Sequence, residues 1–220
     1  IVLKAGAKYD FSVFLRNPDD VDKQVRIVLT RPGQGWGRPA TALADTTIAV
    51  SGRDWKKYEL TMTAKEDASN ASLQLLSLTV GEMDVDMVSL FPQDTYKGHG
   101  LRKDLAQALA DLNPKFMRFP GGCVVHGGGD GFWDTYRWKT TVGPREQRRQ
   151  IKNTWGYHQS MEMGYFEYFQ FCEDLGMEPL PILPCGVNCQ GTNGGWNMRT
   201  QAQDAAPMSE MDEWAQDALD

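Results

Sequence analysis

Acidic residues are missing from the part of this 220-residue sequence that otherwise looks most like an active site. No Asp or Glu occurs between Lys115 and Gly129, where a short apolar run stops at Pro-Gly-Gly and opens into a glycine-rich loop. The next extended run ends near Pro184, and no acidic residue follows it as far as Gln190. Side chains in these stretches can bind and orient a substrate, but they cannot supply paired carboxylic acids for general acid–base catalysis. We therefore expect no catalytic residue in this chain.

Other absences argue against whole classes of function. The apolar runs are too short to span a bilayer, and a net charge of −6 argues against nucleic acid or an anionic membrane as a partner. Cys185 and Cys189 have a C-x3-C spacing without a second Cys or His pair nearby. That spacing predicts neither a zinc site nor a disulfide framework. We expect no metal and no cofactor.

Residues 1–92 have the pattern of a β domain. Short runs with partial alternation of apolar and polar residues are separated by turn signals such as Asn17-Pro18-Asp19-Asp20 and Ser51-Gly52-Arg53-Asp54. Several short strands with regular turns favour a β-sandwich of the jelly-roll type. The predicted strands span residues 9–15, 25–30, 55–63, 72–80 and 84–90.

Residues 93–220 instead alternate helix and strand. The pattern predicts helices near 101–112, 164–175 and 209–220, extended segments at 115–119 and 178–184, and a long irregular stretch at 120–160. This order is typical of a (β/α) barrel or a doubly wound sheet. Two strands cannot close a barrel, so either the remainder comes from elsewhere or the sheet is small and open. The chain lacks an initial Met and stops within a helical pattern, and we expect it to be a piece of a longer protein.

Polar and aromatic residues follow both extended segments. If the two strands are parallel, their carboxyl ends lie at the same edge, where α/β folds build active sites. Aromatic faces that stack on sugar C–H surfaces, with Arg and Asn bonding hydroxyl groups, make a carbohydrate site chemically sensible there. The candidate substrate-binding residues are Arg118, Cys123, His126, Trp155 and Asn188.

Each candidate also has a structural interpretation. Arg118 would then form a buried ion pair, Cys123 would be a small packing residue, and Trp155 would belong to a loop core. His126 would be a hydrogen-bonding loop residue. The basic run from Arg145 to Lys152 is interpreted as a solvated face.

The order of several motifs resembles the α-L-arabinofuranosidases of glycoside hydrolase family 51. The most specific motif is Phe116-Met117-Arg118-Phe119-Pro120-Gly121-Gly122-Cys123. The other matching segments are residues 86–92, 100–109, 138–144, 155–159 and 167–176, so the likeness covers about residues 86 to 190. Residues 1–85 resemble, more loosely, a carbohydrate-binding-module-like sandwich that larger members insert near the start of the catalytic barrel.

The resemblance implies a retaining (β/α)8 TIM barrel that removes terminal non-reducing α-L-arabinofuranosyl groups from arabinan, arabinoxylan or their oligosaccharides. Family members use a Glu acid/base in an Asn-Glu pair after strand four and a Glu nucleophile after strand seven. No Asn-Glu dipeptide occurs in this chain. We therefore expect the inserted sandwich (1–92) and barrel strands two and three (93–220), with the remainder of the barrel as a partner and no activity in isolation.

The resemblance also bears on the candidate residues and on the rival functions. By position, Arg118, Cys123 and Trp155 match the family's substrate-pocket wall, whereas many members have Glu where His126 stands. The rivals are a non-catalytic carbohydrate-binding protein and a related barrel glycosidase such as an endoglucanase or xylosidase. Homo-oligomers are common in the family, and both export and intracellular action on imported oligosaccharides fit it. In the sandwich, Trp55 is expected in the core, and Trp36 is the better candidate for sugar stacking.

Overall fold

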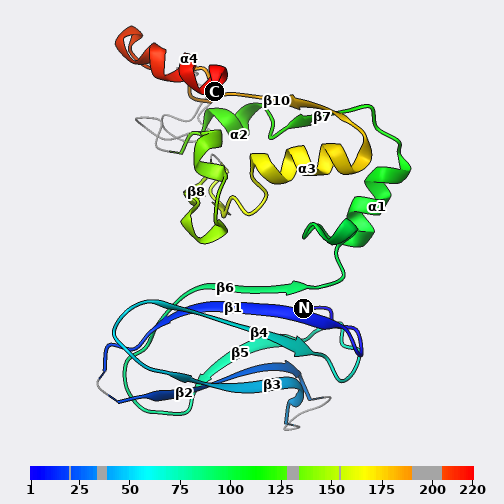
Figure 1. Cartoon of the computed structure of the whole chain (residues 1–220), viewed down its shortest axis with the longest axis vertical. Helices are drawn as coiled ribbons and strands as arrows, with labels where there is room; N and C mark the ends of the chain where they lie inside the picture. The colour runs from blue at the N-terminus through cyan, green and yellow to red at the C-terminus, as the bar shows by residue number, and fades with distance from the viewer. Residues whose placement is uncertain (20, 34–38, 128–133, 154, 190–204) are drawn as a thin grey trace. The chain divides into compact units, whose positions relative to one another are not determined.

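The computed structural model describes residues 1–19, 21–33, 39–127, 134–153, 155–189 and 205–220 (Figure 1). The chain forms two compact units, residues 1–106 and 107–220. Within the described residues, no helix is both long and apolar enough to cross a membrane.

The first unit contains two three-stranded antiparallel sheets (Figure 1). One has the order β4-β1-β6 and the other the order β3-β2-β5. The strands are β1 (Lys8–Arg16), β2 (Lys23–Arg31), β3 (Thr41–Val50), β4 (Lys56–Thr63), β5 (Ser72–Ser77) and β6 (Asp84–Pro92).

Alternation along the strands builds one apolar core between these sheets. In β1, Phe11 and Val13 are buried, and in β2, Ile27 and Leu29 belong to the same buried cluster. Because successive side chains of a strand point to opposite faces, each sheet contributes one face to this core. The first unit is therefore a β-sandwich, as predicted.

The structure corrects two sequence-based predictions in this unit. Strand β3 (Thr41–Val50) was not predicted, although it pairs along β2 from Lys23↔Val50 to Arg31↔Thr41. Its alternation is blurred by Ala44-Asp45-Thr46-Thr47, where small and polar residues follow one another. Trp55 is 45% exposed, and the Arg16 guanidinium lies 5.3 Å from its ring centroid, so Trp55 is not a core residue. Trp36 lies outside the described residues.

The second unit is built around a two-stranded parallel sheet of β7 (Phe116–Phe119) and β10 (Glu178–Pro181). Helix α3 (Tyr165–Leu175) covers β7, because the Phe119 ring packs against Tyr165, Tyr168 and Phe169. The other elements of this unit are α2 (Gly122–His126), η3 (Trp138–Thr141), η4 (Arg145–Gln147), β8 (Ile151–Lys152), β9 (His158–Gln159), η5 (Met208–Glu210) and α4 (Met211–Leu219). The short helix η1 (Tyr96–Gly98) belongs to the first unit, and α1 (Lys103–Asp111) spans the boundary in the sequence between the two.

The ends of these elements follow from local chemistry. Helix α3 stops at Gly176, which has a left-handed backbone (φ +66°) and donates its N–H to the Glu173 carbonyl. At the start of β10, the Glu178 N–H donates to the Lys115 carbonyl just before β7, and just after β10 the Ile182 N–H donates to the Phe119 carbonyl. The residues between them that point the other way, Pro179 and Pro181, therefore remove no hydrogen bond to β7. The predicted helix and strand order of this unit is confirmed, and closure into a (β/α)8 barrel stays a prediction.

Candidate functional site

The carboxyl ends of β7 and β10 lie side by side. Phe119 pairs with Pro181, and the Ile182 N–H donates to the Phe119 carbonyl over 2.7 Å. Further on, the Cys189 N–H donates to the Gly127 carbonyl over 3.1 Å. The segments that follow the two strands are therefore joined by backbone hydrogen bonds at both ends.

Four of the five predicted residues lie on β7 or on the segments that follow the two strands. Arg118 is exposed on β7, and its guanidinium lies next to Gly122, where a Cβ atom would be 3.8 Å from Nη2. Cys123 is an exposed free thiol in the short helix α2. His126 ends that helix half-buried, and its carbonyl accepts a hydrogen bond from Thr135 Oγ1. Asn188, on the segment after β10, is buried.

The fifth predicted residue, Trp155, lies on a different element. It belongs to the hairpin formed by β8 and β9, and 45% of it is exposed, so it is not part of a loop core. Its ring stacks on the Tyr157 ring with centroids 6.2 Å apart. Its backbone N–H donates to Asn153 Oδ1. Among the described residues, these are its ring contact and its hydrogen bond, and neither reaches the strand-end residues.

A buried ion pair supports this hairpin and was not predicted. Arg148 donates from Nη1 and Nη2 to the two carboxylate oxygens of Glu167, at 2.9 and 2.8 Å. The interpretation of residues 145–152 as a solvated face is therefore wrong for Arg148, which is 7% exposed. Burial alone would raise the pKa of Glu167, but hydrogen bonds from Arg148 and from the Gly164 N–H lower it below its usual value. Nothing in the sequence of residues 145–152 distinguishes Arg148 from the other basic residues of the run.

A second charged network ties helix α4 to the loop before α3. Asp217 is buried and accepts a hydrogen bond from Arg137 Nε, and the Arg137 guanidinium also lies 4.5 Å from the Trp214 ring centroid. Lys139 Nζ lies 3.1 Å from the same carboxylate, and Trp138 Nε1 donates to the Asp217 carbonyl over 2.7 Å. These partners hold the Asp217 carboxylate in its charged form, which suits a structural anchor rather than a general acid.

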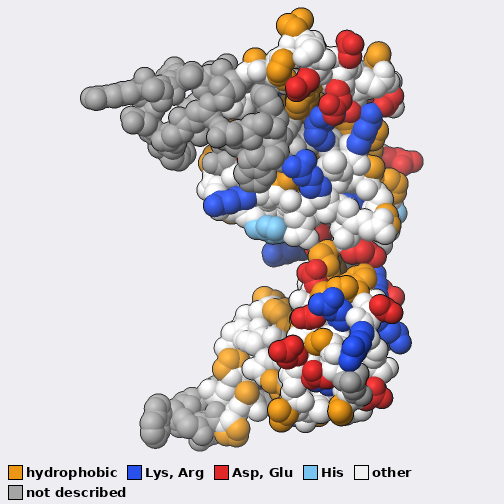
Figure 2. Space-filling view, turned by 90° about the vertical axis from the view of Figure 1, so that its left-hand side faces the viewer, with side chains coloured by type: hydrophobic (Ala, Val, Ile, Leu, Met, Phe, Trp, Pro, Cys, Tyr) orange, Lys and Arg blue, Asp and Glu red, His pale blue; other side chains and the backbone are white. Residues whose placement is uncertain are grey.

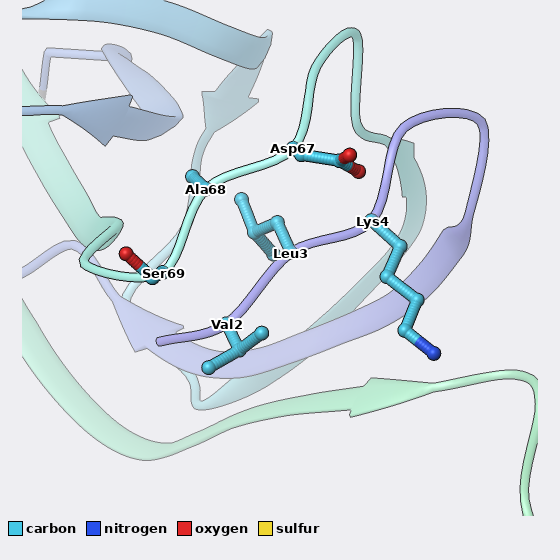
Figure 3. Close-up of a pocket in the computed structure, with 6 residues that line it drawn as sticks. All are labelled: Val2, Leu3, Lys4, Asp67, Ala68 and Ser69. Atoms are coloured by element: carbon cyan, nitrogen blue, oxygen red, sulfur yellow. The ribbon is translucent and has the colours of Figure 1, made fainter.

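Two cavities of the described structure are lined by none of the five predicted residues. An open cavity of about 570 Å³ in the sandwich is lined by Val2, Leu3, Lys4, Asp67, Ala68 and Ser69 (Figure 3). No aromatic ring lines it, so it offers no stacking surface for a sugar. A cavity of about 390 Å³ beside α3 is mostly apolar, with Phe166, Phe169 and Met177 in its wall. Within the described part of the chain, no group of three or more His, Cys, Asp or Glu side chains is arranged to hold a metal ion.

Known proteins resemble this chain over both units. The family model "Alpha-L-arabinofuranosidase 1 domain" matches residues 108–220. An extracellular exo-α-L-arabinofuranosidase of Streptomyces chartreusis is 41% identical over 204 residues, covering 88% of this chain and 23% of the relative. Alpha-L-arabinofuranosidase 1 of Arabidopsis thaliana is 36% identical over 190 residues, covering 84% of this chain and 27% of the relative.

A solved structure gives the same assignment. The arabinose-bound MgGH51 α-L-arabinofuranosidase superposes with a TM-score of 0.80 and 26% sequence identity, covering 100% of this chain and 34% of that one. The chain thus spans roughly a quarter to a third of the length of these relatives. By its sequence and its fold, the chain belongs to the α-L-arabinofuranosidases of glycoside hydrolase family 51.

Proposed function

We propose that this chain is part of a retaining α-L-arabinofuranosidase and supplies one wall of its arabinose site. The observation that carries the proposal is the backbone pairing that joins the ends of β7 and β10 and the segments after them. It supports placing Arg118, Cys123, His126 and Asn188 in this wall. The substrate is a terminal non-reducing α-L-arabinofuranosyl group on an arabinan- or arabinoxylan-type polysaccharide or oligosaccharide. The relatives' names and the arabinose-bound neighbour support this substrate class.

The proposed scaffold is a (β/α)8 barrel in which β7 and β10 are strands two and three. Parallel neighbours with a covering helix are the repeating unit of such a barrel. Large apolar side chains of the described structure are exposed around this pair and offer a surface for the remainder of the barrel: Leu109, Leu112, Phe116, Phe166 and Leu180. Residues 1–92 are then the carbohydrate-binding-module-like jelly roll and residues 93–220 the partial barrel.

Within this assignment, the chain's residues bind and orient the sugar. Arg118 offers its guanidinium N–H groups as hydrogen-bond donors to the hydroxyl groups of the sugar. Asn188 offers both a donor and an acceptor, and Trp155 offers an aromatic face to C–H groups. The two catalytic Glu residues of a retaining mechanism belong to strands four and seven, outside these 220 residues, so residues 1–220 alone are expected to be inactive.

The test is turnover of 4-nitrophenyl α-L-arabinofuranoside by the complete gene product. Because a hydrogen bond to a charged group is worth about 1.5–3 kcal/mol, Arg118→Ala is expected to lower kcat/KM roughly 10- to 100-fold. The matched control is Arg102→Ala, which removes an exposed Arg that pairs with Asp104 before helix α1. Wild-type turnover by Arg118→Ala would show that Arg118 does not bind the substrate. Activity confined to xylosides or glucosides would contradict the assignment as an arabinofuranosidase and would favour another barrel glycosidase.

A further inference from the structure

Asn188 lies on a short segment whose backbone is attached on both sides. Before Asn188, the Gly186 carbonyl accepts a hydrogen bond from the Ala206 N–H over 2.7 Å. After it, the Cys189 N–H donates to the Gly127 carbonyl over 3.1 Å. Asn188 itself is 1% exposed. The position of its side-chain amide therefore depends on where these two attachments hold the backbone.

Trp214 of helix α4 packs on the first of these attachments. Gly186 is buried and has a left-handed backbone (φ +74°). A Cβ atom built on Gly186 would lie 3.2 Å from Cδ1 and from Nε1 of the Trp214 indole, and 3.2 Å from the Ala206 Cβ. Contacts this short are rare for a Cβ atom, so the indole leaves no room for a side chain at Gly186. The backbone conformation and the close approach of the ring both require glycine there.

A guanidinium group holds the indole in turn. Trp214 is 7% exposed, and the Arg137 guanidinium lies 4.5 Å from its ring centroid. Arg137 also pairs with two carboxylates of the same helix, because its Nη1 lies 3.0 Å from Glu213 Oε1 and its Nε donates to Asp217. A buried ring that is fixed by close packing and by a cation–π contact has few alternative positions. A change of the Trp214 side chain should therefore shift the Gly186 backbone.

We propose that Trp214 is a positioning residue of the arabinose site, which holds Gly186 in place and thereby orients Asn188 toward the sugar. Trp214 acts through the backbone of residues 186–189 and does not touch the substrate. The proposal rests on the proposed function, because Asn188 belongs to the wall only within that assignment. A Trp214 that merely stabilised α4 would affect activity in the same way whether or not Asn188 were present.

The first experiment changes the contact from the glycine side and measures kcat/KM of the complete gene product for 4-nitrophenyl α-L-arabinofuranoside. Gly186→Ala places a methyl group against the indole and is expected to lower kcat/KM about tenfold, since a small misplacement of a binding group is costly. The matched control is Gly176→Ala. Gly176 has a similar backbone (φ +66°), but a Cβ atom there meets nothing within 4 Å. This control should stay within about twofold of wild type, because it adds backbone strain without a contact.

The second experiment tests whether Trp214 acts through Asn188. Trp214→Leu removes the indole and is expected to lower kcat/KM about tenfold, whereas Trp214→Phe keeps an aromatic ring and should stay within about threefold of wild type. Added to Asn188→Ala, Trp214→Leu should cause less than about a twofold further loss, because residues that act as a unit are not additive. Added to Arg118→Ala, it should keep its full effect. If Trp214→Leu does not fold, Gly186→Ala replaces it in the same comparison.

Three results would overturn the proposal. Equal further losses in the Asn188→Ala and Arg118→Ala backgrounds would make Trp214 purely structural. Wild-type kcat/KM in Gly186→Ala would show that the contact does not matter, and wild-type kcat/KM in Asn188→Ala would remove the residue on which Trp214 acts. If the wild-type protein cleaves no arabinofuranoside, the proposed function itself fails, which is a different outcome.

Discussion

In the sandwich the buried side chains are nearly all apolar, whereas in the second unit polar and charged side chains are buried among the loops. Among the described residues, the buried polar side chains of residues 1–106 are Asn17, Lys23 and Thr30. Those of residues 107–220 are Asp134, Thr135, Thr141, Arg148, Asn153, Glu167, Asn188 and Asp217. On the visible surface of both units, acidic and basic side chains are interspersed (Figure 2). The units therefore differ in what they bury and not in the kinds of charge they expose.

The difference follows from the amount of regular structure. Strands β1 and β2 each pair with two neighbours, so their backbone groups are satisfied by the sheets and apolar side chains fill the core. Most of residues 134–164 belongs to no long helix or strand, and buried side chains such as Arg148 bond its backbone carbonyls instead. A unit that presents a site on loops thus depends on single polar residues, and a sandwich depends on a shared core.

Phe11→Ala is the substitution with the largest expected effect. The Phe11 ring is 1% exposed in the sandwich core, and Phe→Ala in a core costs about 3–5 kcal/mol, because apolar burial is lost and a cavity remains. Amide hydrogen exchange of the complete gene product should accelerate in residues 8–16 and 23–31. If each unit is stabilised by its own interactions, the amides of residues 165–175 should keep their protection against hydrogen exchange. Equal acceleration in both places would break the comparison.

Sequence-based prediction also succeeded to different degrees in the two units. In the sandwich, alternation predicted β1, β2, β4, β5 and β6 to within a few residues, because core and surface positions there follow a period of two. It failed for β3, where Ala-Asp-Thr-Thr interrupts the period, and for Trp55, whose ring packs under an Arg at the surface. Burial of one residue at a strand end depends on neighbours that a local pattern does not contain.

In the second unit, the sequence predicted the strand ends but not what holds the loop beside them. Arg118, Cys123, His126 and Asn188 were predicted as a group because they lie on or after the ends of the two extended segments, and the parallel pairing of those segments is observed. The pairing of Arg148 with Glu167 spans 19 residues and has no spacing rule, since it depends on the path of an irregular loop. Long-range polar contacts of this kind are visible only in three dimensions.

Arg148→Ala carries the next largest expected effect and tests the polar half of the comparison directly. Removing one partner of a buried ion pair leaves the other charge uncompensated, so we expect a loss of about 3 kcal/mol in the free energy of unfolding. The matched control is Arg26→Ala in the sandwich, which breaks the exposed Arg26–Asp45 pair on β2 and β3. Its urea midpoint should be indistinguishable from wild type, because exposed pairs contribute little. Similar losses for both variants would show that burial of the pair is not what matters.

The smallest expected effect is a pH dependence centred on Asp217. Burial raises the pKa of this carboxyl, but the hydrogen bonds from Arg137 and Lys139 outweigh burial, and the pKa lies below its ordinary value of 3.8. A carboxyl whose pKa is lower in the folded state binds fewer protons there than in the unfolded chain. Its contribution to stability is therefore fully present above the ordinary value and is lost as the pH falls through the folded value.

Asp217→Asn keeps the shape of the side chain and removes its charge, so it isolates this contribution. In urea unfolding of the complete gene product, the variant should be less stable than wild type at pH 6, and the gap should close as the pH is lowered below 3.8. A gap of constant size at every pH would mean that Asp217 acts through hydrogen bonds that Asn does not replace and not through its charge. The contrast between an apolar sandwich and an ion-paired second unit would then reduce to one of polarity.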